Sequence, residues 1–339
     1  MGAYSSNKDT FKYLNSHKVR NAWKIYRSFH KSRKSGEASM TANPFALSIE
    51  PTTACNLGCP ECPSGLKQFT RNTGNLKSDF FKKMIDELEK ELIYLTFYFQ
   101  GEPYINPDFL DMVNYAHRKG IYTATSTNAH FISPEKAKQI VASDLSEIII
   151  SIDGMKQESY EKYRVKGKLE KVIEGTKNLI TAKKDLKRTN PHIVFQFLVV
   201  KYNENEINKL HELAKELGVD EVRLKTVQVY DFKTGNDLLP TNEKYSRYKQ
   251  LKSGEYVLKN QFKNKCWRMW SSCVFTWDGS VAPCCFDKDA QHKMGTVTQS
   301  SFDQIWRNGI YQRFRQDILK TREEIEICKN CSEGSKVWV

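Results

Sequence analysis

The stretch FALSIEPTTACNLGCPEC, residues 45–62, indicates how the rest of the chain is organised. Its first six residues predict a β-strand, and Pro51 ends it because proline cannot donate to a sheet ladder. The loop that follows carries Cys55, Cys59 and Cys62 with the spacing C-x3-C-x2-C. Three thiols on one loop cannot all pair with one another as disulfides, but together they can hold one soft metal centre. We therefore expect a strand that leads into a metal-binding loop.

The choice of metal depends on how many ligands lie near this loop. Structural zinc takes four ligands, but the next histidine is His117 and the next cysteine is Cys266. Three thiolates leave one metal position open, and an open position on iron can hold a reactive ligand. The spacing favours iron, with a zinc site completed by a distant residue as the alternative.

The composition is that of an ordinary globular protein. Of the 339 residues, 39% are hydrophobic and 27% are charged, which suits one large domain plus a small one. No apolar run reaches the length of about eighteen residues that spans a bilayer. Residues 1–10 do not resemble a secretory signal. Nine cysteines without such a signal indicate metal ligation in a reducing compartment, so we expect a cytoplasmic protein.

The N-terminal segment is strongly basic. The net charge is +13, and residues 1–36 contribute +8 of it through nine Lys or Arg and one acid. Residues 8–34 predict a basic amphipathic helix. We expect its apolar face to contain Phe11, Leu14, Ala22, Trp23, Tyr26 and Phe29. This face could pack on the main domain, and the helix could instead lie on an anionic membrane, hold nucleic acid or receive an acidic peptide.

Strands and helices alternate from residue 45 to residue 226. The expected strands are 45–50, 92–99, 121–126, 145–152, 192–200 and 219–226, and the expected helices are 78–90, 107–119, 133–141, 168–185 and 204–217. Six such units predict an α/β fold with a parallel sheet and right-handed crossovers. Because a closed barrel needs eight units, we expect an open partial (β/α)6 TIM-like barrel. Periodicity alone does not separate it from a flat doubly wound sheet.

Polar residues and glycines follow each of the later strands. They occur at 100–103, 126–128, 151–154 and 201–203, and Lys225 lies in the sixth strand. Ligands of parallel sheets bind at the carboxyl ends of strands. Each group taken alone could be a turn former or a cap. Together with the cysteine loop, they favour a single ligand site at that edge.

A second set of cysteines follows an irregular connector at 227–262. It comprises Cys266, Cys273, Cys284, Cys285, Cys328 and Cys331. Residues 277–281 between them predict a tight hairpin around an Asp-Gly pair. A four-thiolate site is expected here, and its chemistry allows either zinc or an iron–sulfur cluster. Neighbouring residues of a strand point in opposite directions, so only one of Cys284 and Cys285 is expected to be a ligand.

The first cysteine loop closely resembles that of the radical S-adenosylmethionine (SAM) enzymes. Their signature, C-x3-C-x-aromatic-C, binds a [4Fe-4S] cluster whose fourth iron holds SAM. The resemblance implies Cys55, Cys59 and Cys62 as cluster ligands, although Glu61 occupies the aromatic position. It covers residues 45–226 and favours the partial barrel over the flat sheet.

The same resemblance implies the residues that contact SAM. Residues 100–103, Gln-Gly-Glu-Pro, resemble a Gly-Gly-Glu-Pro motif whose backbone and glutamate hold the SAM amino group. Residues 151 and 153 match positions at the ribose or carboxylate, and residue 164 matches an arginine suited to pairing with the carboxylate. The implied contacts are Gly101, Glu102, Pro103, Ser126, Asn128, Ser151, Asp153 and Arg164.

The second cysteine set resembles the SPASM-type auxiliary-cluster domain that follows some radical SAM cores. The resemblance implies one auxiliary [4Fe-4S] cluster, with a structural zinc knuckle as the alternative. The implied ligands are Cys266, Cys284, Cys328 and Cys331, and Cys273 and Cys285 are the alternatives. The expected divisions are an extension at 1–44, a barrel at 45–226, a connector at 227–262 and a cluster domain at 263–339.

The resemblance implies reductive cleavage of SAM to a 5′-deoxyadenosyl radical, which takes a hydrogen atom from a substrate. Net oxidation or maturation of a peptide or small molecule would follow, with a flavodoxin or ferredoxin as reductant. No catalytic residue is assigned, although Gln196, Tyr202 and Lys225 are expected to face the substrate. The alternative is a non-enzymatic, zinc-stabilised protein whose basic helix holds nucleic acid. Aromatic and basic residues alternate only in that helix, which counts against this alternative.

Overall fold

The structure is a computed structural model that describes residues 8–259 and 263–332. The described residues form two compact units. The first draws on Met1–Ala54, Phe69–Thr125 and Phe262–Cys331, and the second on Cys55–Gln68, Ser126–Gln261 and Ser332–Val339. This grouping differs from the segments expected from the sequence, whose division into domains stays a prediction.

The first unit is built on a sheet with the strand order β11-β10-β9-β1-β2-β3. The strands are β1 (Ala46–Ile49), β2 (Tyr94–Phe97), β3 (Tyr122–Thr127), β9 (Ser272–Phe275), β10 (Ser280–Ala282) and β11 (Gly295–Thr296). Strand β1 pairs in parallel with β2 on one side and with β9 on the other. Strand β10 pairs antiparallel with β9 on one side and with β11 on the other. The C-terminal hairpin therefore extends the same sheet as the first strand of the chain.

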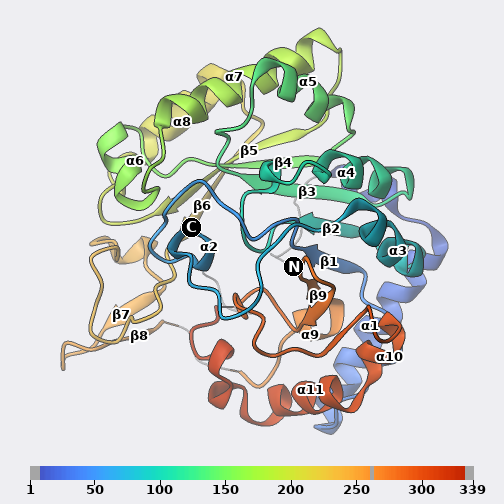
Figure 1. Cartoon of the computed structure of the whole chain (residues 1–339). Helices are drawn as coiled ribbons and strands as arrows, with labels where there is room; N and C mark the ends of the chain where they lie inside the picture. Colours follow the sequence, from blue (N-terminus) through green and yellow to red (C-terminus); the bar gives the residue numbers. More distant parts are fainter. Residues whose placement is uncertain (1–7, 260–262, 333–339) are drawn as a thin grey trace. The chain divides into compact units, whose positions relative to one another are not determined.

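Helices of the first unit pack against this sheet. The sequence places apolar residues at helical spacing in α3 (Ser78–Leu88) and α4 (Phe109–Arg118), which lie side by side (Figure 1). The Phe97 ring of β2 lies 5.4 Å from the Phe81 ring and 5.5 Å from the Phe109 ring. The C-terminal segment adds the helices α9 (Arg268–Ser271), α10 (Phe302–Arg307) and α11 (Gly309–Thr321).

The second unit contains the parallel strands β4 (Glu147–Ser151), β5 (His192–Val199) and β6 (Glu221–Thr226). Helices α5 (Pro134–Ala142), α6 (Gln157–Tyr163), α7 (Leu169–Asp185) and α8 (Ile207–Leu217) lie alongside them (Figure 1). Ser133 caps α5 by accepting a hydrogen bond from the backbone N–H of Lys136, as its position before Pro134 predicts. Gly218 ends α8 in the left-handed conformation at a φ of 81°.

The structure differs from the expected elements in α6, in the connector and at the start of α3. Helix α6 was not expected, because its sequence QESYEKY is mostly polar. The connector contains the short hairpin β7 (Tyr248–Gln250) and β8 (Tyr256–Leu258) (Figure 1). Serine often caps a helix, but the N-cap of α3 is Lys77, and the Ser78 hydroxyl donates to Asp111.

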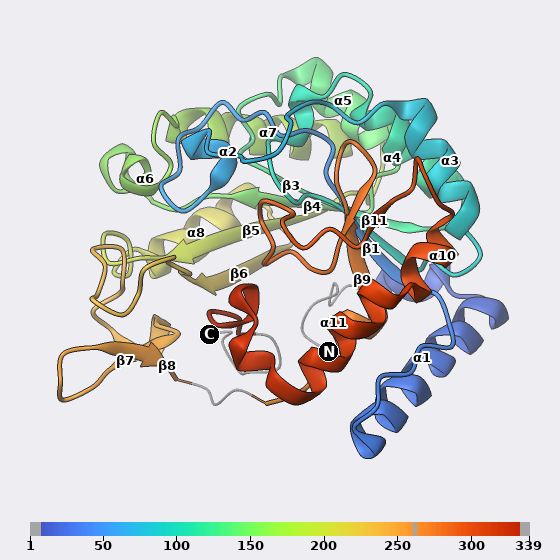
Figure 2. The same cartoon turned by 60° about the horizontal axis from the view of Figure 1, so that its bottom comes forward.

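The N-terminal segment is two helices rather than one. A 3-10 helix, η1 (Lys8–Tyr13), is followed by α1 (Ser16–Ser35), which Figure 2 shows near α11. Side chains of α11 bond to the end of this segment, where the Gln316 amide donates to the Gly36 carbonyl. Asn15 accepts from the backbone N–H of Lys18 at 2.9 Å and starts α1.

The expected apolar face of this segment is wrong at Phe11, Trp23 and Tyr26, which are exposed, whereas Leu14 and Ala22 are half-buried and Phe29 is buried. The Phe29 ring is buried 5.2 Å from Trp267 and 5.3 Å from Trp270, whereas Trp23 and Tyr26 are 55% and 53% exposed. The break before Asn15 separates Phe11 and Leu14 from the later residues, and the unit buries the side of α1 that carries Ile25. Among the described residues, no helix has both the length and the hydropathy for crossing a bilayer.

Candidate functional site

The first cysteine loop lies in the second unit and turns back tightly on itself. Cys62 precedes a short helix, α2 (Pro63–Leu66), and its backbone N–H donates to the Cys59 carbonyl at 3.3 Å. The N–H of Leu57 donates to the Cys55 sulfur at 3.5 Å. A Cβ added to Gly65 would stand 2.6 Å from the Cys59 nitrogen, so this turn requires glycine. The backbone thus keeps the three thiols on one compact loop.

Two contacts hold the loop against the strands of its unit. The Asn128 amide nitrogen donates to the Asn56 side chain at 2.8 Å, and the Gly58 N–H donates to the Val165 carbonyl at 2.9 Å. Asn128 is buried, and Ser126, at the end of β3, is half-buried. The structure therefore shows Asn128 positioning the loop, a role that the sequence did not indicate.

An ion pair stands beside Cys59. Arg164 pairs with the Asp153 carboxylate, and its other guanidinium nitrogen lies 3.7 Å from the Cys59 sulfur. Asp153 also accepts a hydrogen bond from the Leu198 N–H at 2.6 Å. Ser151 is buried at the end of β4, opposite Gln196 in the neighbouring strand. Two of the expected SAM contacts, Arg164 and Asp153, thus lie beside the loop.

Burial raises the pKa of the Cys59 thiol, and the Arg164 charge lowers that pKa in part. Desolvation disfavours a thiolate, whereas a neighbouring cation favours it. A thiolate is the form that ligates iron, so the arginine assists ligation at a site whose burial alone opposes it.

Glu61 stands where the radical SAM signature has an aromatic residue, and the structure shows what this carboxylate contacts. It accepts a hydrogen bond from the backbone N–H of Tyr230 at 2.9 Å. Tyr230 follows β6 at the start of the connector. Glu61 therefore joins the cysteine loop to the connector within the same unit.

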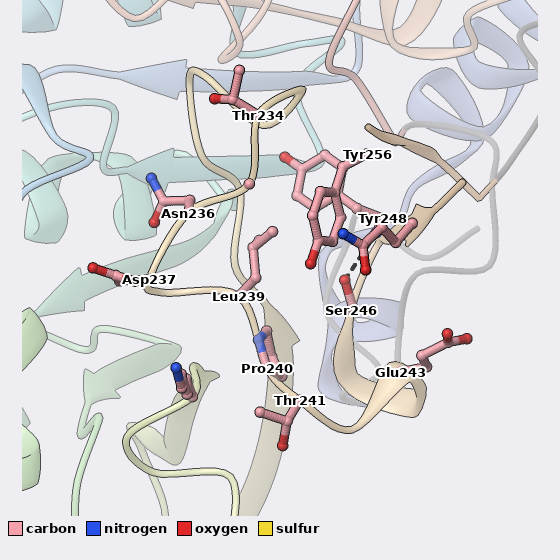
Figure 3. Close-up of a pocket in the computed structure, with 13 residues that line it drawn as sticks. Thr234, Asn236, Asp237, Leu239, Pro240, Thr241, Glu243, Ser246, Tyr248 and Tyr256 are labelled. Carbon is pink, nitrogen blue, oxygen red and sulfur yellow. Dashed lines mark hydrogen bonds between the residues drawn. The ribbon is translucent and has the colours of Figure 1, made fainter. Parts of the chain in front are cut away.

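An apolar cluster links the loop to a pocket in the connector. It contains Leu57, Cys59, Tyr163, Val200, Val227, Val229, Leu238, Leu239 and Tyr248, with Cys55, Cys62 and Tyr256 packed against it. Leu239, Tyr248 and Tyr256 also line a pocket of about 760 Å³ (Figure 3). Its other lining residues are mostly polar and include Lys201 after β5, Asp237 and Glu243. The volume is in the range of small-ligand pockets.

Position 101, in the first unit, accepts only glycine. Its φ is +75°, and an added Cβ would stand 2.2 Å from the Thr52 carbonyl oxygen. The next residue, Glu102, is buried and donates its backbone N–H to the Ala54 carbonyl at 2.8 Å. Pro103 opens the short helix η2 (Pro103–Ile105), and the Glu102 carboxylate accepts from the Tyr104 N–H. The motif thus packs directly on the segment that leads from β1 to the cysteine loop.

A second ion pair, which the sequence did not indicate, follows β1. Glu50 is fully buried and accepts two hydrogen bonds from the Arg71 guanidinium and one from the Trp277 N–H. Burial raises the pKa of Glu50, and Arg71 lowers that pKa in part. Arg71 and Trp277 are distant in sequence, so no local pattern marks this contact. It joins the end of β1 to the hairpin of the second cysteine set.

The second cysteine set lies in the first unit, and five of its six thiols, Cys266, Cys284, Cys285, Cys328 and Cys331, affect one another. Burial raises the pKa of Cys284, with Cys285, Cys331 and Cys266 adding to the rise. Burial together with Cys266 raises the pKa of Cys328 to about 11. The Cys331 N–H donates to the Cys328 carbonyl at 3.0 Å in the turn after the short helix η5 (Glu326–Cys328).

Of the two alternative ligands, Cys285 lies beside Cys284, whereas Cys273 has other surroundings. Cys273 is buried in β9, where burial raises its thiol pKa and the nearby charge is that of Arg315. The Cys285 sulfur lies 3.9 Å from the Arg268 guanidinium. These surroundings support Cys266, Cys284, Cys328 and Cys331 over Cys273 as the ligand set.

A buried arginine, Arg322, lies beside Cys266, Cys328 and Cys331. Arg322 donates to the Cys331 sulfur at 3.3 Å and to the Lys265 carbonyl at 2.6 Å. Burial alone would lower the pKa of this guanidinium, but Cys266, Cys331 and Cys328 raise it. Each cysteine set thus has an arginine beside a sulfur, the half-buried Arg164 at the first and the buried Arg322 at the second.

The donors of both sets are cysteine thiols, which are the ligands of iron–sulfur clusters. All nine cysteines lie in the described part of the chain as thiols. Among the described residues, no three His, Cys, Asp or Glu side chains are spaced for one metal ion. A tetrahedral zinc brings its sulfurs to about 3.8 Å from each other. A four-iron cluster binds each cysteine through a different iron and holds the sulfurs further apart.

Comparison with known proteins decides the family. The model of the radical SAM superfamily matches residues 49–217. The chain belongs to this superfamily. The model of the SPASM iron–sulfur cluster-binding domain matches residues 266–332 of this chain. The chain is therefore a radical SAM enzyme with an auxiliary-cluster domain, and the nucleic-acid-binding alternative is not supported.

Relatives and solved structures agree with this family. The mycofactocin maturase MftC of Mycobacterium ulcerans is 28% identical over 85% of this radical SAM chain and 80% of its own. Pyrococcus furiosus has a tungsten-containing aldehyde ferredoxin oxidoreductase cofactor-modifying protein that is 26% identical. The match covers 84% of this chain and 86% of that protein. SuiB of Streptococcus suis, solved with its precursor peptide SuiA, has a TM-score of 0.61 at 15% identity. The match covers 99% of this chain and 80% of the SuiB chain. This likeness confirms the α/β fold with a parallel sheet, as in radical SAM partial barrels.

Proposed function

We propose that this radical SAM enzyme modifies a peptide by taking a hydrogen atom from it. Cys55, Cys59 and Cys62 hold the [4Fe-4S] cluster that carries SAM. A single auxiliary [4Fe-4S] cluster binds to Cys266, Cys284, Cys328 and Cys331. The mutual effects of Cys266, Cys284, Cys328 and Cys331 on their pKa values favour them over Cys273, and Cys285 stays the alternative to Cys284. When bound, the first cluster and SAM together supply the 5′-deoxyadenosyl radical.

The chain's own residues bind and orient SAM in this proposal. The backbone of Gly101 and Pro103 and the carboxylate of Glu102 hold its amino group. The close turn that brings them there is possible only with glycine at position 101. Ser151, Asp153 and Arg164 hold its ribose and carboxylate, with smaller roles for Ser126 and Asn128. Arg164 now pairs with Asp153, so it would exchange part of that pair for the SAM carboxylate.

The substrate class rests on the pocket that shares its apolar wall with the cysteine loop (Figure 3). Its lining offers charges of both signs, hydroxyl groups and two tyrosine rings, which suits a peptide segment with polar main-chain groups. The structure of SuiB with its precursor peptide SuiA also favours a peptide. Lys201 and Asp237 are positioned to bind the charged groups of such a segment.

The first experiment tests the class of reaction. Protein purified without oxygen should contain about eight irons per chain, as two four-iron clusters require. Dithionite and SAM should then yield 5′-deoxyadenosine, which a Cys59→Ala variant should not form. Zinc in place of iron, without SAM cleavage, would refute the proposal.

The second experiment tests the substrate class. The enzyme is given extract from deuterium-grown cells of the organism that makes it, separated into peptide and small-molecule fractions. Deuterium in the 5′-deoxyadenosine marks the fraction that donates the hydrogen atom. We expect it with the peptide fraction, and we expect protease treatment to abolish it. Deuterium from the small-molecule fraction would replace the peptide by a small molecule. A cytoplasmic flavodoxin or ferredoxin as the electron donor belongs to the same proposal.

A further inference from the structure

Helix α1 carries positive charge without any negative charge. Its twenty residues, SHKVRNAWKIYRSFHKSRKS, include seven Lys or Arg and no Asp or Glu. One side of the helix is buried in the first unit through Asn21, Ile25, Ser28, Phe29 and Ser32. The opposite side is exposed and is not used by the SAM chemistry. The contacts on the buried side fix which residues the helix presents outward.

The exposed side consists of two parallel strips. The aromatic strip comprises Val19, Trp23, Tyr26 and His30, and the first three are 51%, 55% and 53% exposed. The cationic strip comprises Arg20, Arg27 and Lys34, which recur every seventh residue and are also exposed. At about 100° per residue, the two strips lie next to each other along the helix.

Contacts within the strips order their side chains. The Arg27 guanidinium lies 4.7 Å from the centre of the Trp23 ring, and the Tyr26 and His30 rings are 4.2 Å apart. No carboxylate of the described residues pairs with Arg20, Arg27 or Lys34. Only two acids, Asp9 and Glu333, have side chains that are not described, so this chain has little negative charge to offer the strips. Complementary charge must come from another molecule.

The spacing of the aromatic strip indicates the shape of that molecule. Its residues are separated by four, three and four positions, which is the seam that one helix presents to another in a coiled coil. A cation at every seventh position beside such a seam pairs with acids on the facing helix. We propose that α1 docks an acidic amphipathic helix of a partner protein or peptide.

A membrane surface fits the same residues less well. A helix that lies in a bilayer has a broad apolar face with cations along both borders. In α1 the cations gather on one border of the aromatic strip, while the body of the unit lies beyond the other. On the far border, Arg33 is engaged by the Phe29 ring at 5.5 Å.

A pair of synthetic peptides tests this docking surface. Both are about three heptads long with Leu and Ile at the seam, and the flanking positions are Glu in one and Lys in the other. Fluorescence anisotropy of the labelled peptides measures their binding to the reconstituted enzyme. The Glu peptide should bind and the Lys peptide should not. Vesicles of phosphatidylcholine and phosphatidylserine serve as the membrane probe.

Charge reversal gives the sharpest result. The triple variant Arg20→Glu/Arg27→Glu/Lys34→Glu should bind the Glu peptide roughly ten- to hundredfold more weakly, since three ion pairs become repulsions. The same variant should gain binding of the Lys peptide. Trp23→Ala should weaken Glu-peptide binding roughly tenfold, as expected of an aromatic anchor. The control Lys177→Glu/Lys209→Glu/Lys215→Glu makes the same charge change on α7 and α8 and should bind the Glu peptide like the wild type.

Three outcomes would overturn the docking surface. They are absence of Glu-peptide binding, equal loss in the control, and binding to the vesicles without binding to the peptide. SAM cleavage in the absence of peptide should be unchanged in every variant. Failure here would therefore leave the proposed radical chemistry intact.

Discussion

The two cysteine sets differ in how the chain brings their thiols together. Cys55, Cys59 and Cys62 share one loop, which has local hydrogen bonds and a tight turn at Gly65 and is also held by Asn128 and Val165. Cys266, Cys284, Cys328 and Cys331 come from three separate stretches of the first unit. The first set therefore depends on a loop, and the second depends on the tertiary fold of its unit. Loss of a ligand should affect chemistry at the first set and both chemistry and stability at the second.

The largest expected contrast is between Cys59→Ala and Cys284→Ala. Each variant should lose about four of about eight irons. SAM cleavage should disappear only in Cys59→Ala. The free energy of unfolding should fall by several kcal/mol only in Cys284→Ala, because that cluster joins distant stretches of the chain. Iron analysis, 5′-deoxyadenosine formation and thermal unfolding measure the three effects.

Cys273→Ala is the matched control for these two variants. Cys273 is buried in β9 but lies outside the interacting thiols, so its variant should retain about eight irons. Loss of four irons in this variant would instead make Cys273 an auxiliary ligand.

A smaller effect is expected where glycine is required. Gly101 and Gly120 both have positive φ, at 75° and 66°, but only Gly101 has backbone where a Cβ would stand. Gly120→Ala should therefore lose only about 1–2 kcal/mol of stability from the left-handed conformation. Gly101→Ala should lose more stability and bind SAM at least tenfold more weakly. Calorimetric titration with SAM and thermal unfolding compare the two variants, and equal SAM affinities would show that the close turn does not serve SAM.

The smallest expected effect is on the potential of the auxiliary cluster. Arg322 places a positive charge at Cys331, and such a charge favours the reduced cluster. Arg322→Gln should lower the midpoint potential by roughly 60 mV, which is a tenfold change for one electron. Arg322→Lys should restore most of this shift, and Arg313→Gln, on the exposed side of α11, should leave the potential unchanged. A redox titration followed by electron paramagnetic resonance measures it. Equal potentials in the Gln and Lys variants would assign the effect to the lost hydrogen bond.

What the sequence predicts well is what neighbouring residues determine. The Ser133 cap of α5 and the Gly218 end of α8 depend on contacts within a few residues, and the three cysteines of the first loop lie close together in the sequence. The alternating pattern likewise predicts the six parallel strands, because each strand carries its own apolar run.

What the sequence misses depends on residues that are far apart in the chain. Glu50 meets Arg71 and Trp277, and no spacing rule links the three. The exposed side of α1 was predicted as its buried side, because both sides of that helix carry aromatic residues and only packing selects Phe29. Arg322 has no signal in the sequence, since its sulfur partner forms part of a site that only the fold assembles.

The parallel pairing of β1 with β9 has a consequence for synthesis of the protein. β1 ends at Ile49 and β9 begins at Ser272, so the ribosome makes over two hundred residues between them. At about 5–20 residues per second, one edge of β1 waits roughly 10–40 s for its neighbour. An unpaired edge strand is a template for aggregation. The nascent chain therefore has an interval in which it needs protection, and the interval closes only when the final fifth of the protein emerges.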